Sequence, residues 1–462
     1  MTDPFIHPYV PNTAPASRQA MLDAVGATSV DEFYADVPAD LRLGRDLDLP
    51  EPLVAEQELV RHVGGLLRRN RAVEPGRLFL GAGTYRHAVP AVVDEVINRS
   101  EFLTAYAGEP YEDHGRFQAL FQYQSLMGEL LNLDVVNVPT YDGYQAAATS
   151  LAMATRITGR RGIVLVSDVH PDKLSKVRDY IRPIADLVVV PSASGEADLD
   201  AALSHIDHGT AAVWVETPSF HGALETRLAE LADAAHQVGA LLVAGTDPIM
   251  LGAIASPSDL GADIVHGDIQ SLGLHPWYGG AHAGFIAVDD DTRLVMELPS
   301  RLFGLASTDV PGEYGFGDVA YDRTSFALRE EGKEWVGTAA ALWGIAAGVY
   351  LALMGPQGMA EVGETILART AYARQALTAL PGVADADGAI HFREFVLDLS
   401  AASLTAPAVV EALRGRGFEP GLALGDDRLL VCVTEENTQT DIDELAAAFA
   451  AALAHADEEK NA

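Results

Sequence analysis

Two short apolar runs of the sequence each break into polar residues that could do chemistry. Asp247 follows the run at 241–244, and Gln270 follows a second run at 263–265. Apolar runs that end in Gly, Pro and Asp predict buried strands whose carboxyl ends meet at one edge of a sheet. Ligands of open α/β sheets bind at that edge. We therefore expect Asp247 and Gln270 to line one crevice, although two strand ends with a capping Asp would give the same pattern.

Two further positions belong to the same predicted edge. His170 follows a strand predicted at 162–166; it could stack on a planar ring, but a loop histidine with a structural hydrogen bond fits its spacing equally well. Gly143 opens a predicted helix, and the free N–H groups of a helix N-terminus can bind an anion. Asp142 would repel a phosphate there and could satisfy those N–H groups itself as the N-cap. We favour the cap.

Lysine and cysteine are scarce, which limits covalent chemistry. The chain has 31 basic residues, of which four are lysines, at positions 173, 176, 333 and 460. None of them follows the strand that ends near Val265, so Schiff-base chemistry at that strand end has no lysine to use. The single cysteine, Cys432, lies in an apolar run and is expected to be a buried strand thiol. It excludes an intrachain disulfide framework and a cysteine metal cluster, and no metal site is expected.

Composition restricts the partners and the compartment. The chain of 462 residues has a formal net charge of −35, which argues against nucleic acid or an anionic membrane as a partner. The single cysteine fits a reducing cytoplasm, and no basic-then-apolar signal peptide opens the sequence. The apolar run 339–354 is short for a membrane span and is expected to be a buried core helix.

The secondary-structure pattern predicts an α/β protein. Strands alternate with helices along the middle of the chain, which favours parallel pairing with right-handed crossovers. The strands are expected at 135–138, 162–166, 187–190, 211–215, 241–244 and 263–265, and the helices at 56–71, 90–98, 116–132, 146–157 and 225–238, with two more starting at 173 and 199. Short helices are expected at 17–25 and 29–34.

The same pattern divides the chain into three parts. Residues 1–75 are expected to form an N-terminal arm with short helices, which could wrap a neighbouring subunit or dock loosely. Residues 76–335 form the large α/β domain, and residues 336–462 form a linking helix and a small α/β domain. In the small domain we expect strands at 395–399 and 429–433, a helix at 406–415 and a final helix. Thr440 and Asp443 have the spacing of a capping box ahead of that last helix.

Taken together, several segments resemble one family, the N-terminal subunit of the split P-protein of the glycine cleavage system, which is a glycine decarboxylase. The likeness runs from about residue 8 to about residue 450. Its motifs are specific in combination: FLGAG (79–83), HAVPAVVDEVINRSEFLTAY (87–106), YDG (141–143), GADIVHGDIQSLG (261–273), GG..AGF (279–285) and LLVCVTE (429–435).

The resemblance implies a fold and the position of a cofactor site. The fold would be the aspartate-aminotransferase fold (type I) of pyridoxal-phosphate enzymes, with a large doubly wound mixed sheet and a small C-terminal α/β domain. Asp247 corresponds to the residue that pairs with the pyridinium nitrogen, and Gln270 stands where the Schiff-base Lys would be. Asp247, His170 and Gly143 would then be a vestigial cofactor site, and this chain would carry no confident catalytic residue.

The resemblance also implies partners. Pyridoxal phosphate would be used in the assembled complex and held by a homologous Lys-bearing catalytic subunit, in a heterodimer or heterotetramer, with none bound covalently to this chain. The family reaction removes carbon dioxide from glycine, with the pyridine ring as electron sink, and passes the aminomethyl group to the lipoyl arm of H-protein.

This sequence departs from the family pattern in two polar segments, at 107–115 and 331–338. Ordinary sequence drift is one explanation, but two changes in polar segments near the crevice favour a paralogous subunit that serves another amino acid or carrier. Candidates for the substrate or shared site are Tyr106, Tyr111, His114 and Arg86, because the acidic loop 107–113 would oppose a substrate carboxylate unless an Arg compensates. The remaining alternative is a purely structural partner that contributes no site residue.

Overall fold

The computed structural model describes residues 9–45, 47–103, 114–193, 195–319, 321–333 and 340–461. The chain divides into two compact units, residues 1–72 and residues 73–462.

The first unit is made of short helices that bury few of their apolar residues. The predicted helix at 17–25 is present as α1 (Pro15–Val25), of which only Leu22 is buried. The segment 29–34 forms a 3-10 helix, Val30–Tyr34, which a capping box between Ser29 and Glu32 begins. The predicted helix at 56–71 is present as α2 (Glu56–Leu67), with no buried residue.

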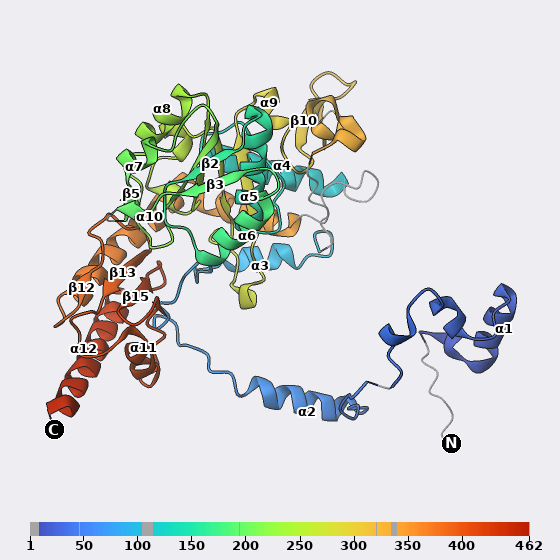
Figure 1. The fold of residues 1–462 in the computed structure, drawn as a ribbon, viewed down its shortest axis with the longest axis horizontal. Helices are drawn as coiled ribbons and strands as arrows, with labels where there is room; N and C mark the ends of the chain where they lie inside the picture. Colours follow the sequence, from blue (N-terminus) through green and yellow to red (C-terminus); the bar gives the residue numbers. More distant parts are fainter. Residues whose placement is uncertain are drawn as a thin grey trace. The chain divides into compact units, whose positions relative to one another are not determined.

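The second unit is organised around a seven-stranded mixed sheet (Figure 1) in the order β1-β9-β8-β7-β6-β2-β3. The five strands from β8 to β3 are parallel, as the alternating pattern predicts, whereas β9 runs antiparallel to both of its neighbours, β8 and β1. Their bounds are β1 Val135–Val136, β9 Gly284–Val288, β8 Ile264–Asp268, β7 Leu241–Thr246, β6 Thr210–Thr217, β2 Gly162–Leu165 and β3 Asp186–Val189.

Helices cover both faces of this sheet because its strands are apolar on both sides. Within β6, Val213 packs into one buried cluster with helices α3, α4, α8 and α10, while its neighbour Trp214 packs into another with α5 and α6. This alternation is the period-2 pattern of a strand buried on both faces. The helices are α3 Ala91–Ile97, α4 His114–Leu131, α5 Gly143–Thr158, α6 Pro171–Ile181, α7 Leu199–Leu203, α8 Leu228–Gln237 and α9 Thr292–Val295.

Two small hairpins lie outside the main sheet. They are formed by β4 (Ser192–Ala193) with β5 (Glu196–Ala197) and by β10 (Phe303–Ser307) with β11 (Tyr314–Asp318).

A long helix leads to the small domain. The apolar run predicted as a core helix begins α10 (Ala341–Thr378), whose first half is largely buried. Gly355 interrupts this helix with a φ of 58°, a left-handed conformation that favours glycine, directly before Pro356. Among the described residues, no helix is long and apolar enough to cross a membrane.

The small domain is a four-stranded antiparallel sheet in the order β12-β13-β15-β14, packed against α11 (Ala406–Arg414) and α12 (Gln439–Asn461). Figure 1 shows it in orange and red. The strands are β12 Ala384–Asp385, β13 Glu394–Asp398, β14 Leu422–Ala423 and β15 Arg428–Cys432. Cys432 is a buried strand thiol, as predicted.

One detail of the small domain corrects the sequence prediction. The capping contacts of α12 are made by Thr438 and Asp441, not by Thr440 and Asp443. The backbone N–H of Thr438 donates to Asp441 at 2.7 Å, and the backbone N–H of Asp441 donates to the Thr438 hydroxyl at 3.3 Å. Two overlapping Thr-x-x-Asp matches compete in this stretch, and the helix begins at the earlier one.

Candidate functional site

A cavity of about 350 Å³ lies at the carboxyl ends of the parallel strands. The four residues that the sequence places at this edge, Gly143, His170, Asp247 and Gln270, all line it. They come from the start of α5, the loop after β2, the end of β7 and the turn after β8. The parallel sheet therefore brings together positions that are far apart in the sequence.

Gln270 is held by hydrogen bonds on both ends of its side-chain amide. Its Oε1 accepts from the Tyr85 N–H at 2.9 Å, and its Nε2 donates to the carbonyl oxygens of Tyr85 at 2.8 Å and Leu274 at 2.9 Å. The residue is 2% exposed. The side chain therefore acts as a brace between the turn after β8 and the loop at residue 85.

Asp247 is already occupied by a cation of the same chain. Its carboxylate forms an ion pair with the guanidinium of Arg393, which enters from the small domain. The Ser271 hydroxyl donates to Asp247 Oδ1 at 2.9 Å, and the Ile249 N–H donates to the same oxygen at 3.0 Å. The side chains of Asp247 and Arg393 are 9% and 4% exposed. This is a buried, paired charge, the form in which proteins tolerate buried ions.

Arg393 is the residue that sequence reasoning missed. Its guanidinium carbon lies 3.2 Å from the centre of the Tyr85 ring, and its Nη1 lies 3.0 Å from His87 Nε2. Burial opposes the charged form, but Asp247 raises the pKa of Arg393. The available signal was the pair of charges Arg393-Glu394 directly before an apolar strand, because adjacent charges at a buried strand need partners.

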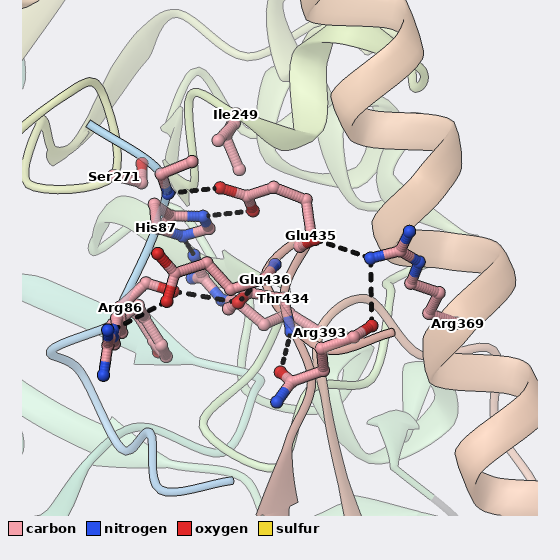
Figure 2. Close-up of polar contacts among 12 residues, drawn as sticks. Arg86, His87, Ile249, Ser271, Arg369, Arg393, Thr434, Glu435 and Glu436 are labelled. Carbon is pink, nitrogen blue, oxygen red and sulfur yellow. Dashed lines mark hydrogen bonds and ion pairs between the residues drawn. The ribbon is translucent and has the colours of Figure 1, made fainter. Parts of the chain in front are cut away.

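Beyond Arg393 the contacts continue across the small domain (Figure 2). His87 is buried, and its Nδ1 lies 2.7 Å from Glu435 Oε2. The Ala88 N–H donates to the other oxygen of Glu435 at 2.7 Å. Burial would raise the pKa of Glu435, but His87 and these hydrogen bonds lower it. Asp247 of the large domain is thus linked through Arg393 and His87 to a carboxylate of the small domain.

Glu394 closes the cavity beside Arg393. Its Oε1 accepts from the Ala82 N–H at 2.6 Å, and its Oε2 accepts from the Tyr85 hydroxyl at 2.8 Å. Burial raises the pKa of Glu394, although Arg393 and these two hydrogen bonds oppose the shift.

Two carboxylates of the chain occupy the place where the start of α5 could bind an anion. Asp142 Oδ1 accepts from the Gln145 N–H at 2.7 Å, so the predicted N-cap is confirmed. Asp268 Oδ2 accepts from the Gly143 N–H at 2.8 Å and lies 3.0 Å from His282 Nδ1. Burial would lower the pKa of His282, but the hydrogen bond and charge of Asp268 raise it.

His170 has the structural hydrogen bond that its spacing allowed. Its Nδ1 accepts from the Asp172 N–H at 3.1 Å and caps α6. Its ring meets the ring of Phe220 edge to face, with 4.8 Å between centroids. Burial lowers the pKa of His170. Because Nδ1 accepts a hydrogen bond, the neutral form of the ring carries its proton on Nε2.

Two lysines line the cavity, which the sequence did not indicate. Lys173 Nζ forms an ion pair with Glu216 at 2.8 Å, with both side chains 12% exposed. Lys176 Nζ lies 4.9 Å from the centre of the Tyr144 ring. Both lysines come from α6 and line the cavity. Their position depends on how that helix packs, and the sequence positions of the lysines do not reveal that packing.

The remaining candidates fall largely outside the described part of the chain. Tyr106 and Tyr111 lie in the undescribed segment 104–113, and His114 is the first residue of α4. Arg86 is described, and its Nε forms an ion pair with Glu436 Oε2 at 2.7 Å (Figure 2). Its guanidinium is therefore engaged by a carboxylate of the small domain. No group of three or more His, Cys, Asp or Glu within the described ranges is placed to hold a metal.

The sheet order, the small domain and the crevice at the strand ends define a fold-type-I protein of the pyridoxal-phosphate class. Solved structures with this fold include a sphingosine-1-phosphate lyase of Burkholderia pseudomallei (15% identity, TM-score 0.66, 92% of this chain and 96% of that chain) and a NifS-like protein (12% identity, TM-score 0.62, 82% and 99%). Within that class, the chain belongs to the glycine cleavage system P-protein family, whose model matches residues 7–449.

Relatives within this family match nearly the whole chain. A probable glycine dehydrogenase (decarboxylating) subunit 1 of Moorella thermoacetica is 38% identical over 96% of this chain and 100% of its own length. The protein of the same name in Desulforamulus reducens is 37% identical over 96% and 99%. A crystal structure of the glycine decarboxylase (P-protein) of the glycine cleavage system, in inhibitor-bound form, matches with a TM-score of 0.82 and 34% identity, covering 98% of this chain and 100% of that chain. The predicted family and fold are confirmed.

The residues of this cavity do not fit pyridoxal phosphate. The ring nitrogen would need the carboxylate of Asp247, which Arg393 already neutralises. The phosphate would need the N–H groups at the start of α5, which Asp142 and Asp268 already occupy with negative charge. A Cβ on Gly143 would lie 3.0 Å from the Cβ of Asp268, so this entrance is also sterically tight. The cavity resembles a cofactor site in position but not in bonding.

Proposed function

We propose that this chain is the subunit of a heteromeric glycine decarboxylase that holds no cofactor, and that a homologous Lys-bearing subunit holds the pyridoxal phosphate. The ion pair between Asp247 and Arg393 carries this proposal, because it supplies internally the positive charge that a pyridinium nitrogen would bring. The name "subunit 1" of the relatives supports a two-subunit enzyme. The bound cofactor of the complex would supply the electron sink for loss of carbon dioxide.

The role of this chain is to complete and stabilise the assembled enzyme. Gln270 braces the turn after β8, where a reactive amine would otherwise be needed. The contacts from Asp247 through Arg393 and His87 to Glu435 hold the small domain against the large sheet. With its two domains held together in this way, the subunit would present one rigid surface to its partner. The aminomethyl group made by the partner would pass to the lipoyl group of H-protein.

Co-expression with the homologous Lys-bearing subunit tests the proposal. We expect a single heteromeric peak on sizing, release of carbon dioxide from carboxyl-labelled glycine when lipoylated H-protein is present, and cofactor bound to the partner chain alone. Borohydride reduction followed by peptide mapping locates the cofactor. A reduced adduct on this chain, or two separate sizing peaks at working concentration, contradicts the proposal.

The variant Gln270→Lys sharpens the test. If a missing lysine were the only difference from a cofactor site, this variant would bind pyridoxal phosphate. We expect it not to, because Asp247 stays paired with Arg393 and Asp268 still occupies the Gly143 N–H. The double variant Gln270→Lys/Arg393→Met, which also frees Asp247, is the matched comparison. Cofactor absorbance in the single variant would show that the ion pair is no obstacle.

A further inference from the structure

We propose that the cavity of this chain is a binding site for a free α-amino acid in its zwitterionic form, separate from the active site of the partner subunit. The carboxylate of the ligand would lie at Lys176 and His170, and its ammonium group at Asp142. The inference concerns binding to this chain alone and does not depend on the decarboxylation reaction.

Two buried hydroxyl groups in the cavity wall lack a partner. Ser219 Oγ and Thr246 Oγ1 are buried, and neither makes a hydrogen bond within the described part of the chain. The two residues are 6% and 7% exposed, and both line the cavity. Buried hydroxyls are normally hydrogen-bonded, so Ser219 and Thr246 mark a polar part of the cavity wall whose hydrogen bonding the described chain leaves incomplete.

The donors that remain available gather at one end of the cavity. His170 Nδ1 accepts from the backbone, which leaves the Nε2–H of the neutral ring as a donor. The Lys176 ammonium has no carboxylate partner among the described residues and lies over the ring of Tyr144, whose centroid is 6.1 Å from that of His170. Ser219 directly precedes Phe220, which contacts the His170 ring. An ammonium and an imidazole N–H together suit a carboxylate.

The acidic residues around the rest of the cavity disfavour a ligand that carries only a negative charge. Acidic residues outnumber basic ones around the cavity, and most of their oxygens accept from protein donors. Two carboxylate oxygens accept no hydrogen bond from the described residues: Asp142 Oδ2, beside the Oδ1 that caps α5, and Asp168 Oδ1, beside the Oδ2 that contacts Ser192 and His221. An acidic environment with an available carboxylate oxygen favours a ligand that also carries an ammonium group. A zwitterion can place its carboxylate at Lys176 and His170 and its ammonium group at Asp142, and it carries no net charge.

The size of the cavity fits this ligand class. Its volume of about 350 Å³ is at the lower end of the range for small-molecule sites, about 300–1,000 Å³. Asp142 and Asp268 at the start of α5 exclude a phosphate there. Glycine, which is both a zwitterion and the substrate of the proposed complex, is the first ligand to try.

Equilibrium dialysis of the full chain against labelled glycine tests the site. We expect one glycine per chain, and no comparable binding of acetate or methylammonium, each of which carries only half of the zwitterion. Asp142→Asn keeps the helix cap, since Asn caps as well as Asp, but removes the charge. We expect this variant and Lys176→Gln each to weaken binding by roughly tenfold or more.

Matched controls separate the site from general effects. Asp198→Asn changes another helix cap, whose Oδ1 accepts from the Ala201 N–H at 3.0 Å, and it lies outside the cavity. Lys333→Gln removes another lysine, and both controls should bind like the parent.

Two results would overturn the inference. No glycine bound at the highest concentration tested, with the chain folded, means that only water completes the hydroxyls. Acetate that binds as tightly as glycine means that the site takes a bare anion. In the assembled complex we expect two glycine sites per pair of subunits, one of which is lost in Lys176→Gln. If the assembled complex binds two glycines but shows no decarboxylation, that result counts against the proposed function and leaves this inference standing.

Discussion

Replacing Arg393 with methionine should destabilise the second unit of the chain strongly. The substitution removes the guanidinium but keeps an unbranched side chain of similar length, so Asp247 is left as a buried carboxylate without its cation. Breaking one partner of a buried ion pair costs about 3–5 kcal/mol in the free energy of unfolding. The contact with the Tyr85 ring and the contact with His87 are lost as well.

A second variant separates the ion pair from simple packing. In Asp247→Asn/Arg393→Met neither charge remains, so the penalty of an unpaired buried carboxylate disappears. Replacing a buried pair by groups of similar volume is often close to neutral. We therefore expect the double variant to recover most of the stability that Arg393→Met loses. Arg393 also has a φ of 63°, a left-handed conformation that costs about 1–2 kcal/mol for a residue with a side chain, and both variants retain this cost.

Urea unfolding of the full chain, followed by far-ultraviolet circular dichroism, measures these changes. Arg161→Met is the control, because Arg161 pairs with Asp186 at the surface, with 53% and 74% of the two side chains exposed. We expect its unfolding midpoint to match that of the parent, since exposed pairs contribute little. A loss below about 1 kcal/mol for Arg393→Met, comparable to a surface pair, would refute the reasoning that Asp247 needs this cation as its buried partner.

Three further predictions concern the cavity and its surroundings. The purified chain, incubated with pyridoxal phosphate and reduced with borohydride, should carry no adduct on Lys173 or Lys176, although both line the cavity; a mapped adduct on either one contradicts the assignment. Burial lowers the pKa of His266 from 6.5 to about 3. As the pH falls below about 6.5, the unfolded chain therefore binds a proton at this residue that the folded chain does not. The free energy of unfolding should then fall by up to ~1.4 kcal/mol per pH unit. His266→Gln should flatten that slope between pH values of about 6.5 and 5, and an unchanged slope would assign it to other groups. If the loop 106–114 sets substrate choice, Arg86→Ala and His114→Ala should change the rates with glycine relative to larger amino acids in the assembled complex; parental rates and ranking would place the loop at a solvated surface.

The fold and the edge that carries the site were predictable from sequence because both rest on local patterns. The apolar runs before Asp247 and Gln270 are strands of the main sheet, and the N-cap at Asp142 is present. A strand buried on both faces must be apolar throughout, and a carboxylate one residue before a helix satisfies its N–H groups wherever the helix lies. Such features need only near neighbours in the chain.

The occupants of the site needed the tertiary structure. No spacing rule pairs Asp247 with Arg393, because the guanidinium comes from the small domain, far along the chain from Asp247. The placement of Lys173 and Lys176 at the cavity depends on how α6 packs. Residue type alone could not distinguish these two from the other two lysines of the chain. The sequence by itself determined that the turn after β8 has Gln270 and no lysine. Only the tertiary structure decided that Arg393 pairs with Asp247 and Lys173 with Glu216, because long-range electrostatic pairing depends on distances in space and not along the chain.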